Sequence, residues 1–532
     1  MYENIIKKYF PYNTARKGQL EALFELFEAK ESYSHFILDA NVGYGKTAIA
    51  RTLVEAMKCE ENESSFILTS TKMLQEQYMI ECINNKHNVN YKLAKGRSNF
   101  YCKWLQNYTL CSEGECVTKD VNEKSECIYG MFGNLPSNNG GCEYYVQKAE
   151  AIDSDVCIMN YDVLLSDKVD HYSNRHIMVC DEAHNIDNKV MQRIGITLSE
   201  PRLKKYGIKI LEEDYDHYDI EYWIDKLEYF KKQLQQSILN PKYYRMNKKQ
   251  VNDAKNLYEK IASRLSDIKF NKDYWFVYPN FFEHKIMIKP LDVRKYVKPY
   301  LLDRATDFHL YMSGSIVDFN NFSKYLGLDE DEFYYLKSNS TFDMSKQNPI
   351  IPKYCGQLTY KQKNKTLPLT YEVLEYILFR HRNDKGIIHC HSKEFRNRIM
   401  ENVSSERLIS YNNSEEKEEV IEYFEDSDDN DVIVAYSLQE GLDLPYDNIR
   451  FQVLYKVPFP FLGDPQIKAR MNADKDWYMI EAIRNIIQAH GRGMRAEDDY
   501  CTNYLIDSSF QGVFKSKLCP TELKECMRRV TL

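Results

Sequence analysis

The chain has 532 residues, which is enough for three to five domains of ordinary size, or for fewer domains with large insertions. Its 79 acidic residues outnumber its 71 basic residues, which excludes a globally basic nucleic-acid coat protein but leaves room for a local basic groove. Hydrophobic residues make up 43% of the chain and charged residues 28%, so we exclude a mainly disordered protein.

Neither a membrane span nor an export signal is recognisable in the sequence. No apolar run approaches the ~18 residues that a membrane helix needs, and the first residues carry charges where a signal peptide needs an apolar stretch. We therefore expect a soluble protein with no membrane partner. We place it in the cytoplasm, or in the nucleus if its source is eukaryotic.

Short apolar runs alternate with helix-length segments in two parts of the chain. In the first third, runs typical of buried strands occupy residues 35–39, 65–69, 156–159 and 177–180. From about residue 345 a second series follows, at residues 386–389, 407–410, 431–435, 451–455 and 504–506. Strands interleaved with helices in this way predict βαβ units and an α/β fold with parallel sheets.

A glycine-containing loop follows the first predicted strand and opens a predicted helix. It runs from Ala40 through Gly43 and Gly45 to Lys46 and Thr47. The backbone N–H groups of such a loop, together with the start of the helix, bind phosphates. We expect Lys46 to reach the β- and γ-phosphates of a nucleotide and Thr47 to hold Mg²⁺.

Residues 96–150 interrupt the α/β pattern. They contain five of the 14 cysteines, namely Cys102, Cys111, Cys116, Cys127 and Cys142. In a reducing cytosol such a group indicates metal ligands before disulfides. No Cys-x-x-Cys pair is present, which favours an iron–sulfur cluster over a zinc ribbon, with unligated cysteines as the alternative.

Paired carboxylates end the strand predicted at 177–180. Asp181 can hold Mg²⁺ through water, and Glu182 can orient and deprotonate an attacking water. Alone, the pair also fits an ordinary acidic surface loop, and the glycine-containing loop at residues 40–47 makes the catalytic interpretation the stronger one.

Residues 200–285 predict a helical hairpin. Apolar residues recur at helical spacing over 223–238 and again over 251–265, and the turn between them is basic, with Lys242, Arg245, Lys248 and Lys249. The tip of this hairpin is either solvated or in contact with phosphates.

The C-terminal part carries two arginines after a helical pattern that begins at Trp477. Arg492 and Arg495 are three residues apart and share one helix face, and Gln488 precedes them. A forked guanidinium suits a γ-phosphate on which negative charge is building, although such pairs also occur on plain surface helices.

In their order along the chain these motifs resemble superfamily 2 helicases, specifically the XPD/DinG-like group of iron–sulfur DNA helicases with a DEAH box. The segment from Arg16 to Gln19 resembles the family's adenine-reading motif, in which the Gln19 amide would pair with both edges of adenine. Residues 68–77 resemble its motif Ia, Ser313 to Ser315 its motif III, residues 439–445 with Asp443 its motif V, and residues 488–495 its motif VI.

The resemblance implies two RecA-like motor domains that share ATP in their cleft, with two insertions in the first. Motor domain 1 would comprise residues 1–95, 151–199 and 286–344, interrupted by an iron–sulfur insertion at 96–150 and a helical arch at 200–285. Motor domain 2 would comprise residues 345–532.

The implied activity is ATP-dependent movement on single-stranded DNA, in the 5′→3′ direction that is general in this family, with unwinding of forked duplexes. The implied cofactors are ATP, Mg²⁺ and a [4Fe–4S] cluster. Lys46, Glu182, Arg492 and Arg495 would be catalytic, and Thr47 and Asp181 would hold Mg²⁺. The ATP-binding residues would be Arg16, Gln19, Ala40, Gly43, Gly45, Lys46, Thr47, Asp181, Gln488 and Asp443. The cluster ligands would be Cys102, Cys111, Cys116 and Cys142, with Cys127 as the alternative.

Two other functions remain compatible with the sequence. One is an ATP-switched nucleic-acid clamp that does not unwind. The other is an RNA helicase with a structural zinc site.

Overall fold

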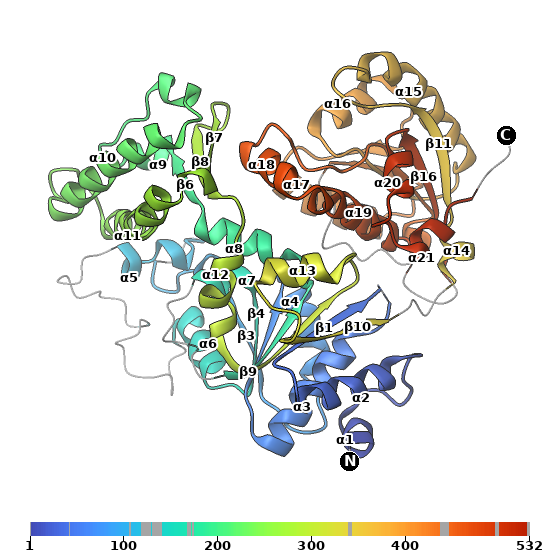
Figure 1. Cartoon of the computed structure of the whole chain (residues 1–532), viewed down its shortest axis with the longest axis horizontal. Helices are drawn as coiled ribbons and strands as arrows, with labels where there is room; N and C mark the ends of the chain where they lie inside the picture. Colours follow the sequence, from blue (N-terminus) through green and yellow to red (C-terminus); the bar gives the residue numbers. More distant parts are fainter. Residues whose placement is uncertain are drawn as a thin grey trace.

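The computed structural model describes residues 2–41, 43–105, 108–118, 129, 141–166, 172, 175–338, 343–436, 446–494 and 499–528. Three of the residues predicted from the sequence, Cys127, Asp443 and Arg495, lie outside these ranges. Figure 1 shows two α/β bodies, the first in blue and yellow and the second in orange and red, with a helical body in green beside them. Among the described residues, no helix is both long and apolar enough to cross a lipid bilayer.

Motor domain 1 is built on a seven-stranded sheet with the order β10-β1-β9-β5-β2-β4-β3, in which every described pair is parallel. The strands are β1 (His35–Ala40), β2 (Ser65–Thr69), β3 (Tyr91–Ala94), β4 (Val156–Asn160), β5 (Arg175–Asp181), β9 (Ala305–Ser313) and β10 (Phe333–Ser338). Its helices are α1 (Tyr2–Tyr9), α2 (Gln19–Lys30), α3 (Lys46–Glu61), α4 (Lys72–Cys82), α6 (Glu143–Ile152), α7 (Tyr161–Ser166), α8 (Ile186–Ile194), α12 (Arg294–Tyr300) and α13 (Phe319–Leu326). Strands such as β2 and β4 are buried along their whole length, as expected for a parallel sheet covered on both faces.

Motor domain 2 contains a six-stranded parallel sheet with the order β11-β16-β15-β12-β14-β13. The strands are β11 (Ile350–Gly356), β12 (Gly386–His389), β13 (Leu408–Ile409), β14 (Val432–Ala435), β15 (Phe451–Leu454) and β16 (Thr502–Asp507). The helices are α14 (Met344–Gln347), α15 (Lys363–Arg380), α16 (Lys393–Asn402), α17 (Ser414–Asp426), α18 (Pro465–Ala473), α19 (Lys475–Gly491), α20 (Phe510–Lys515) and α21 (Thr521–Glu525). The prediction of two parallel-sheet units is confirmed.

The green body, called the hairpin body below, contains the predicted helical hairpin, formed by α10 (Ile220–Leu239) and α11 (Lys248–Phe270). It also contains α9 (Glu200–Lys204) and an antiparallel sheet of β6 (Ile196–Ser199), β8 (Lys285–Pro290) and β7 (Trp275–Asn280). The sequence did not predict this sheet, and the expected domain borders at residues 199/200 and 285/286 fall within it.

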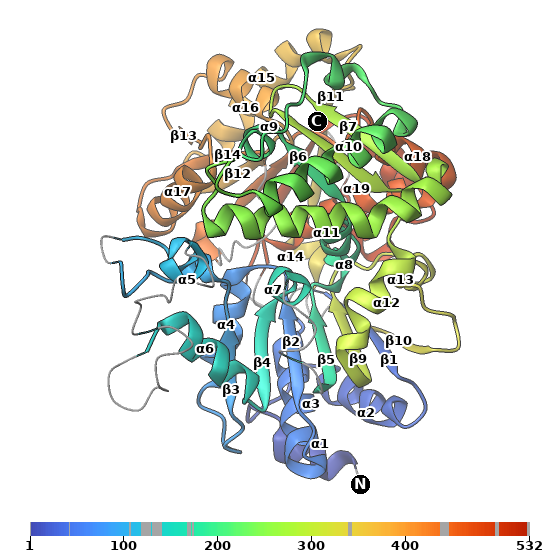
Figure 2. The same ribbon diagram turned by 90° about the vertical axis from the view of Figure 1, so that its left-hand side faces the viewer.

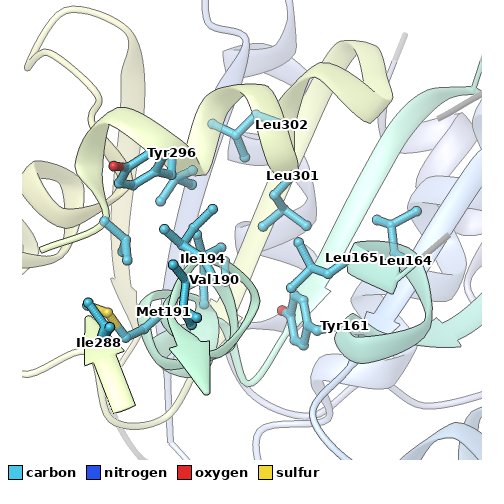
Figure 3. Packing of buried hydrophobic residues seen from close by; sticks show 14 of the residues in the cluster. Tyr161, Leu164, Leu165, Val190, Met191, Ile194, Ile288, Tyr296, Leu301 and Leu302 are labelled. Atoms are coloured by element: carbon cyan, nitrogen blue, oxygen red, sulfur yellow. The ribbon is translucent and has the colours of Figure 1, made fainter. Parts of the chain in front are cut away.

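The hairpin body is fixed to motor domain 1 by a continuous apolar core. Figure 3 shows Val190 and Ile194 of α8 packed among Leu301, Ile288 and neighbouring side chains from α12 and β8. Each of these four residues is fully buried. In Figure 2, α11 crosses above the sheet of motor domain 1 and passes close to α5 (Glu115–Thr118) of the cysteine segment. Lys249, from the predicted basic turn, lies in α11 and pairs with Glu113 at 3.4 Å.

Candidate functional site

The phosphate loop joins β1 to α3 and has the backbone that phosphate binding requires. Gly43 and Gly45 have φ values of 82° and 83°, in the left-handed region that favours glycine. A side chain at Gly45 would also collide with Gln19, because its Cβ would lie 2.2 Å from Gln19 Nε2. Lys46, the first residue of α3, donates to the Ala40 carbonyl at 3.1 Å. Its ammonium group therefore lies across the loop in which phosphates would bind.

Gln19 and Arg16 donate hydrogen bonds to the backbone of this loop. The Gln19 amide nitrogen donates to the Tyr44 carbonyl at 2.8 Å and to the Gly45 carbonyl at 3.2 Å, while its oxygen accepts from the Arg16 N–H at 2.7 Å. Arg16 also donates to the Gly43 carbonyl. Both ends of the Gln19 amide thus contact protein backbone, so this segment braces the phosphate loop whether or not it also contacts adenine.

Asp181 and Glu182 stand at the end of β5, in the same motor domain. Asp181 is 6% exposed, and its burial raises the pKa of its carboxyl group, an effect that the Lys46 charge opposes. Its Oδ1 accepts from the Glu182 N–H at 2.9 Å, and its backbone carbonyl accepts from the Tyr161 hydroxyl at 2.9 Å. Glu182 has φ 47°, a left-handed conformation that is costly for a residue other than glycine and that persists only where surrounding contacts impose it.

His184 connects this acidic pair to two other predicted motifs. Its Nδ1 lies 3.3 Å from Glu182 Oε2 and 2.8 Å from Ser313 Oγ, and its Nε2 lies 2.5 Å from the amide nitrogen of Gln488. A carboxylate only accepts and an amide nitrogen only donates, which assigns the proton of the imidazole to Nδ1. Burial lowers the pKa of His184 well below its usual value, so the ring is neutral.

Helix α19 carries Gln488 and brings further contacts from motor domain 2. Arg484, one turn before Gln488, donates from Nε to the Ser315 carbonyl at 3.2 Å and pairs with Glu481. Arg492 lies buried at the C-terminal end of the same helix, close enough to His389 for its charge to help burial lower the pKa of that imidazole to about 4.

The two motor domains also meet at α18 and the start of α19. Arg470 approaches Asp187, which lies just beyond His184, at 3.4 Å. Asp474 pairs with Lys324 of α13 at 3.1 Å, and Asp464 pairs with Lys289 of β8, in the hairpin body, at 2.5 Å. A cavity of about 240 Å³ separates the domains beside the phosphate loop, lined by residues that include Asn41, Gly314, Ser338, Gly491 and Met494. Within the described part of the chain, none of the predicted ATP-site residues is among those that line this cavity, but Asn41 and Gly491 directly neighbour Ala40 and Arg492 in the chain.

Four of the five cysteines predicted as ligands lie within the described residues, and all four are free thiols. The Cys111 and Cys142 sulfurs are 3.9 Å apart. A methyl group placed on Gly114 would lie 3.3 Å from the Cys102 sulfur and 3.6 Å from the Cys116 sulfur. Two of the four sulfurs therefore lie beside Gly114, and in the described part of the chain no three His, Cys, Asp or Glu side chains are arranged to hold a single metal ion.

The electrostatic surroundings favour a thiolate at Cys142, whereas the hydrogen bond between Cys111 and Cys142 raises the pKa of the Cys111 thiol. The hydrogen bond from Cys111, with help from the backbone N–H groups of Tyr144 and Tyr145 at the start of α6, lowers the pKa of the Cys142 thiol to about 6. The Arg97 guanidinium lies 3.5 Å from the Cys116 sulfur. A thiolate is the form of cysteine that binds metals.

Comparison with known proteins agrees with this geometry. The sequence matches the DEAD_2 family over residues 48–203 and the family described as helicase C-terminal domain over residues 378–525, together more than half of the chain. The chain belongs to the XPD/DinG-like group of superfamily 2 helicases. As such it is an ATP-dependent helicase.

Relatives of this helicase match nearly its whole length at low identity. A Methanocaldococcus jannaschii protein named "Probable ATP-dependent helicase" is 22% identical over 96% of this chain and 94% of its own length. The ATP-dependent DNA helicase YoaA of Escherichia coli is 22% identical over 97% and 95%. A solved XPD helicase superposes with a TM-score of 0.64 at 16% identity, covering 98% of this chain and all of that one. That likeness supports the fold.

Three residues of this helicase site were not assigned a site role from the sequence. Tyr78 and Tyr161 contact Asp181, and Arg484 contacts the Ser315 carbonyl. Arg484 could have been found, because it lies four residues before Gln488 and therefore on the same helix face. Tyr78 directly follows the segment that resembles motif Ia, but no local pattern indicates its contact.

Proposed function

We propose that this helicase uses ATP hydrolysis to move along single-stranded DNA in the 5′→3′ direction and to part forked duplexes. The observation that carries the proposal is the hydrogen bond of 2.5 Å between Gln488 of motor domain 2 and His184 of motor domain 1. His184 also lies against Glu182, so a movement of one domain against the other reaches the residue best placed to activate water. ATP turnover and domain movement are thereby coupled.

In the proposed reaction, water attacks the γ-phosphorus of ATP and the bond to the β-phosphate oxygen breaks, giving ADP and phosphate. Lys46 would hold the β- and γ-phosphates, and Glu182 would take the proton from the attacking water. Arg492 or Arg495 of motor domain 2 would stabilise the charge that develops on the transferred group. Hydrolysis therefore requires the two domains to close on ATP.

Thr47 and Asp181 fit the magnesium ion that accompanies ATP. Both offer oxygen ligands, the type that Mg²⁺ prefers, and both lie close to the Tyr78 hydroxyl, which supports the assignment of one ion to the pair. When bound, the ion would neutralise charge on the phosphates.

The cysteine segment fits an iron–sulfur cluster held by Cys102, Cys111, Cys116 and Cys142. The close approach of the Cys111 and Cys142 sulfurs, and the position of the Cys102 and Cys116 sulfurs beside Gly114, support these four cysteines as thiolate ligands of a [4Fe–4S] cluster. A side chain at Gly114 would come close to the Cys102 sulfur and to the Cys111 carbonyl oxygen, each of which would lie 3.3 Å from its Cβ. Cys127 stays an alternative ligand. We assign the cluster a structural part, as the support of a wedge that separates the strands.

Replacing Cys142 by serine should remove iron from protein purified without oxygen, in which we expect about four irons per chain. Metal–thiolate bonds supply folding free energy to small domains of this kind, so the segment should also become sensitive to protease while ATP turnover persists at least in part. Iron analysis and limited proteolysis measure both effects. Cys59→Ser, at an exposed cysteine, is the matched control. Stoichiometric zinc without iron in the wild-type protein would overturn the cluster.

Strand displacement tests the proposed function itself. A forked DNA duplex with a 5′ single-stranded tail should be separated only with ATP and Mg²⁺, and a tail of RNA should support much less. ATP turnover without separation would favour the nucleic-acid clamp, and a preference for the RNA tail would favour the RNA helicase.

A further inference from the structure

A buried phenol of α4 lies against the two side chains assigned above to Mg²⁺. The Tyr78 side chain is 2% exposed, and its hydroxyl donates to Oδ2 of Asp181 at 3.0 Å. The side chain of Thr47 lies close to the same hydroxyl. Tyr78 thus lies between Thr47, at the end of the phosphate loop, and Asp181, at the end of β5.

The direction of the polar contacts at the Tyr78 hydroxyl follows from the chemistry of the groups. An ionised carboxylate only accepts, so the single proton of Tyr78 is used toward Asp181. The Thr47 hydroxyl can therefore approach Tyr78 only as a donor. A threonine hydroxyl whose proton points toward Tyr78 keeps its lone pairs free to face a cation.

The Asp181 carboxylate is fixed in the same way. Its Oδ1 accepts from the Glu182 N–H at 2.9 Å and its Oδ2 accepts from Tyr78, so both oxygens have a defined direction. A carboxylate has about four acceptor positions, and the two that remain can bind a metal-bound water. A lysine or arginine in the place of Tyr78 would orient the carboxylate equally well, but its charge would repel Mg²⁺.

We propose that Tyr78 is a positioning residue for the magnesium ion, and that its hydroxyl turns the Thr47 hydroxyl and the Asp181 carboxylate toward one cation. The inference rests on the proposed ATP site. It gives Tyr78 a part beyond filling the core, and it assigns that part to the hydroxyl alone, since the ring packs in the apolar cluster of motor domain 1.

Tyr78→Phe tests the proposal, because it removes the hydroxyl and keeps the buried ring. Binding of a fluorescent ATP analogue, titrated with Mg²⁺, should show a magnesium affinity weaker by about 10- to 100-fold, the usual cost of losing a partner of a metal-ligating carboxylate. Binding of the analogue without metal should stay at the wild-type level. ATP turnover should recover when Mg²⁺ is raised to saturation.

Tyr91→Phe is the matched control. Tyr91 is buried in the same apolar cluster, and its hydroxyl bonds a buried carboxylate, that of Glu55 at 3.2 Å. The magnesium affinity of the Tyr91→Phe protein should equal that of the wild type.

Wild-type magnesium affinity in folded Tyr78→Phe protein would overturn the proposal. So would a loss of turnover that saturating Mg²⁺ does not restore, since that result indicates a purely structural residue. If the wild-type protein itself binds the analogue without any dependence on Mg²⁺, the proposed ATP site fails, and this inference fails with it.

Discussion

Replacing Glu182 by glutamine should slow steady-state ATP turnover at least ~10²-fold, because a general base contributes about 10²- to 10⁴-fold. Glutamine keeps the size of the side chain and can still accept a hydrogen bond from His184 Nδ1 through its amide oxygen, so the fold and ATP binding should be preserved. We also expect the variant to retain single-stranded DNA longer, since it would stay in the ATP-bound, closed state. Turnover and the rate of DNA dissociation measure the two effects.

Glu150→Gln is the control for this change. Glu150 lies at the end of α6, is exposed, and pairs with Lys92 at 3.0 Å on the surface of motor domain 1. Its turnover should equal that of the wild type. If Glu182→Gln also turned over ATP at the wild-type rate, another residue would have to activate the water.

Lys46→Ala should abolish ATP hydrolysis in a folded protein. The Lys46 ammonium has one described hydrogen bond, to the Ala40 carbonyl, and the side chain is only partly buried, so its loss costs the fold little. The phosphates, in contrast, would lose the lysine that reaches them from the loop. Turnover and the thermal unfolding midpoint separate the two effects.

Lys58→Ala provides a control in the same helix. Lys58 lies three turns further along α3 and pairs with Asp155 at 2.8 Å, away from the phosphate loop. This variant should hydrolyse ATP normally. Full activity in folded Lys46→Ala protein would remove the phosphate loop from the proposed site.

The parallel strands of both sheets could be predicted because each is a continuous apolar run bounded by polar residues. For example, β2 and β4 are fully buried and their bounds lie within one residue of the prediction. The antiparallel sheet was missed because β6 has only four residues and pairs with β8, almost 90 positions further along the chain. Its strands β7 and β8 alternate buried and half-buried residues, a pattern too short to stand out beside long helices.

In the candidate site, too, local features could be predicted from the sequence and long-range contacts could not. The phosphate loop is a local feature whose glycines and lysine lie within six residues, so its position follows from the sequence. The hydrogen bond from Tyr78 to Asp181 joins residues 103 positions apart, and that from Gln488 to His184 joins residues 304 positions apart. Such contacts depend on the order of strands in the sheet and on the docking of the two domains, which local patterns do not determine.

ATP-dependent separation of a forked DNA duplex with a 5′ tail tests the central claim most directly. The wild-type protein should release the labelled strand only when ATP and Mg²⁺ are both present, should act poorly on a fork that has only a 3′ tail, and should lose the activity in Lys46→Ala. DNA-stimulated ATP hydrolysis with no release of strand from either fork would contradict it.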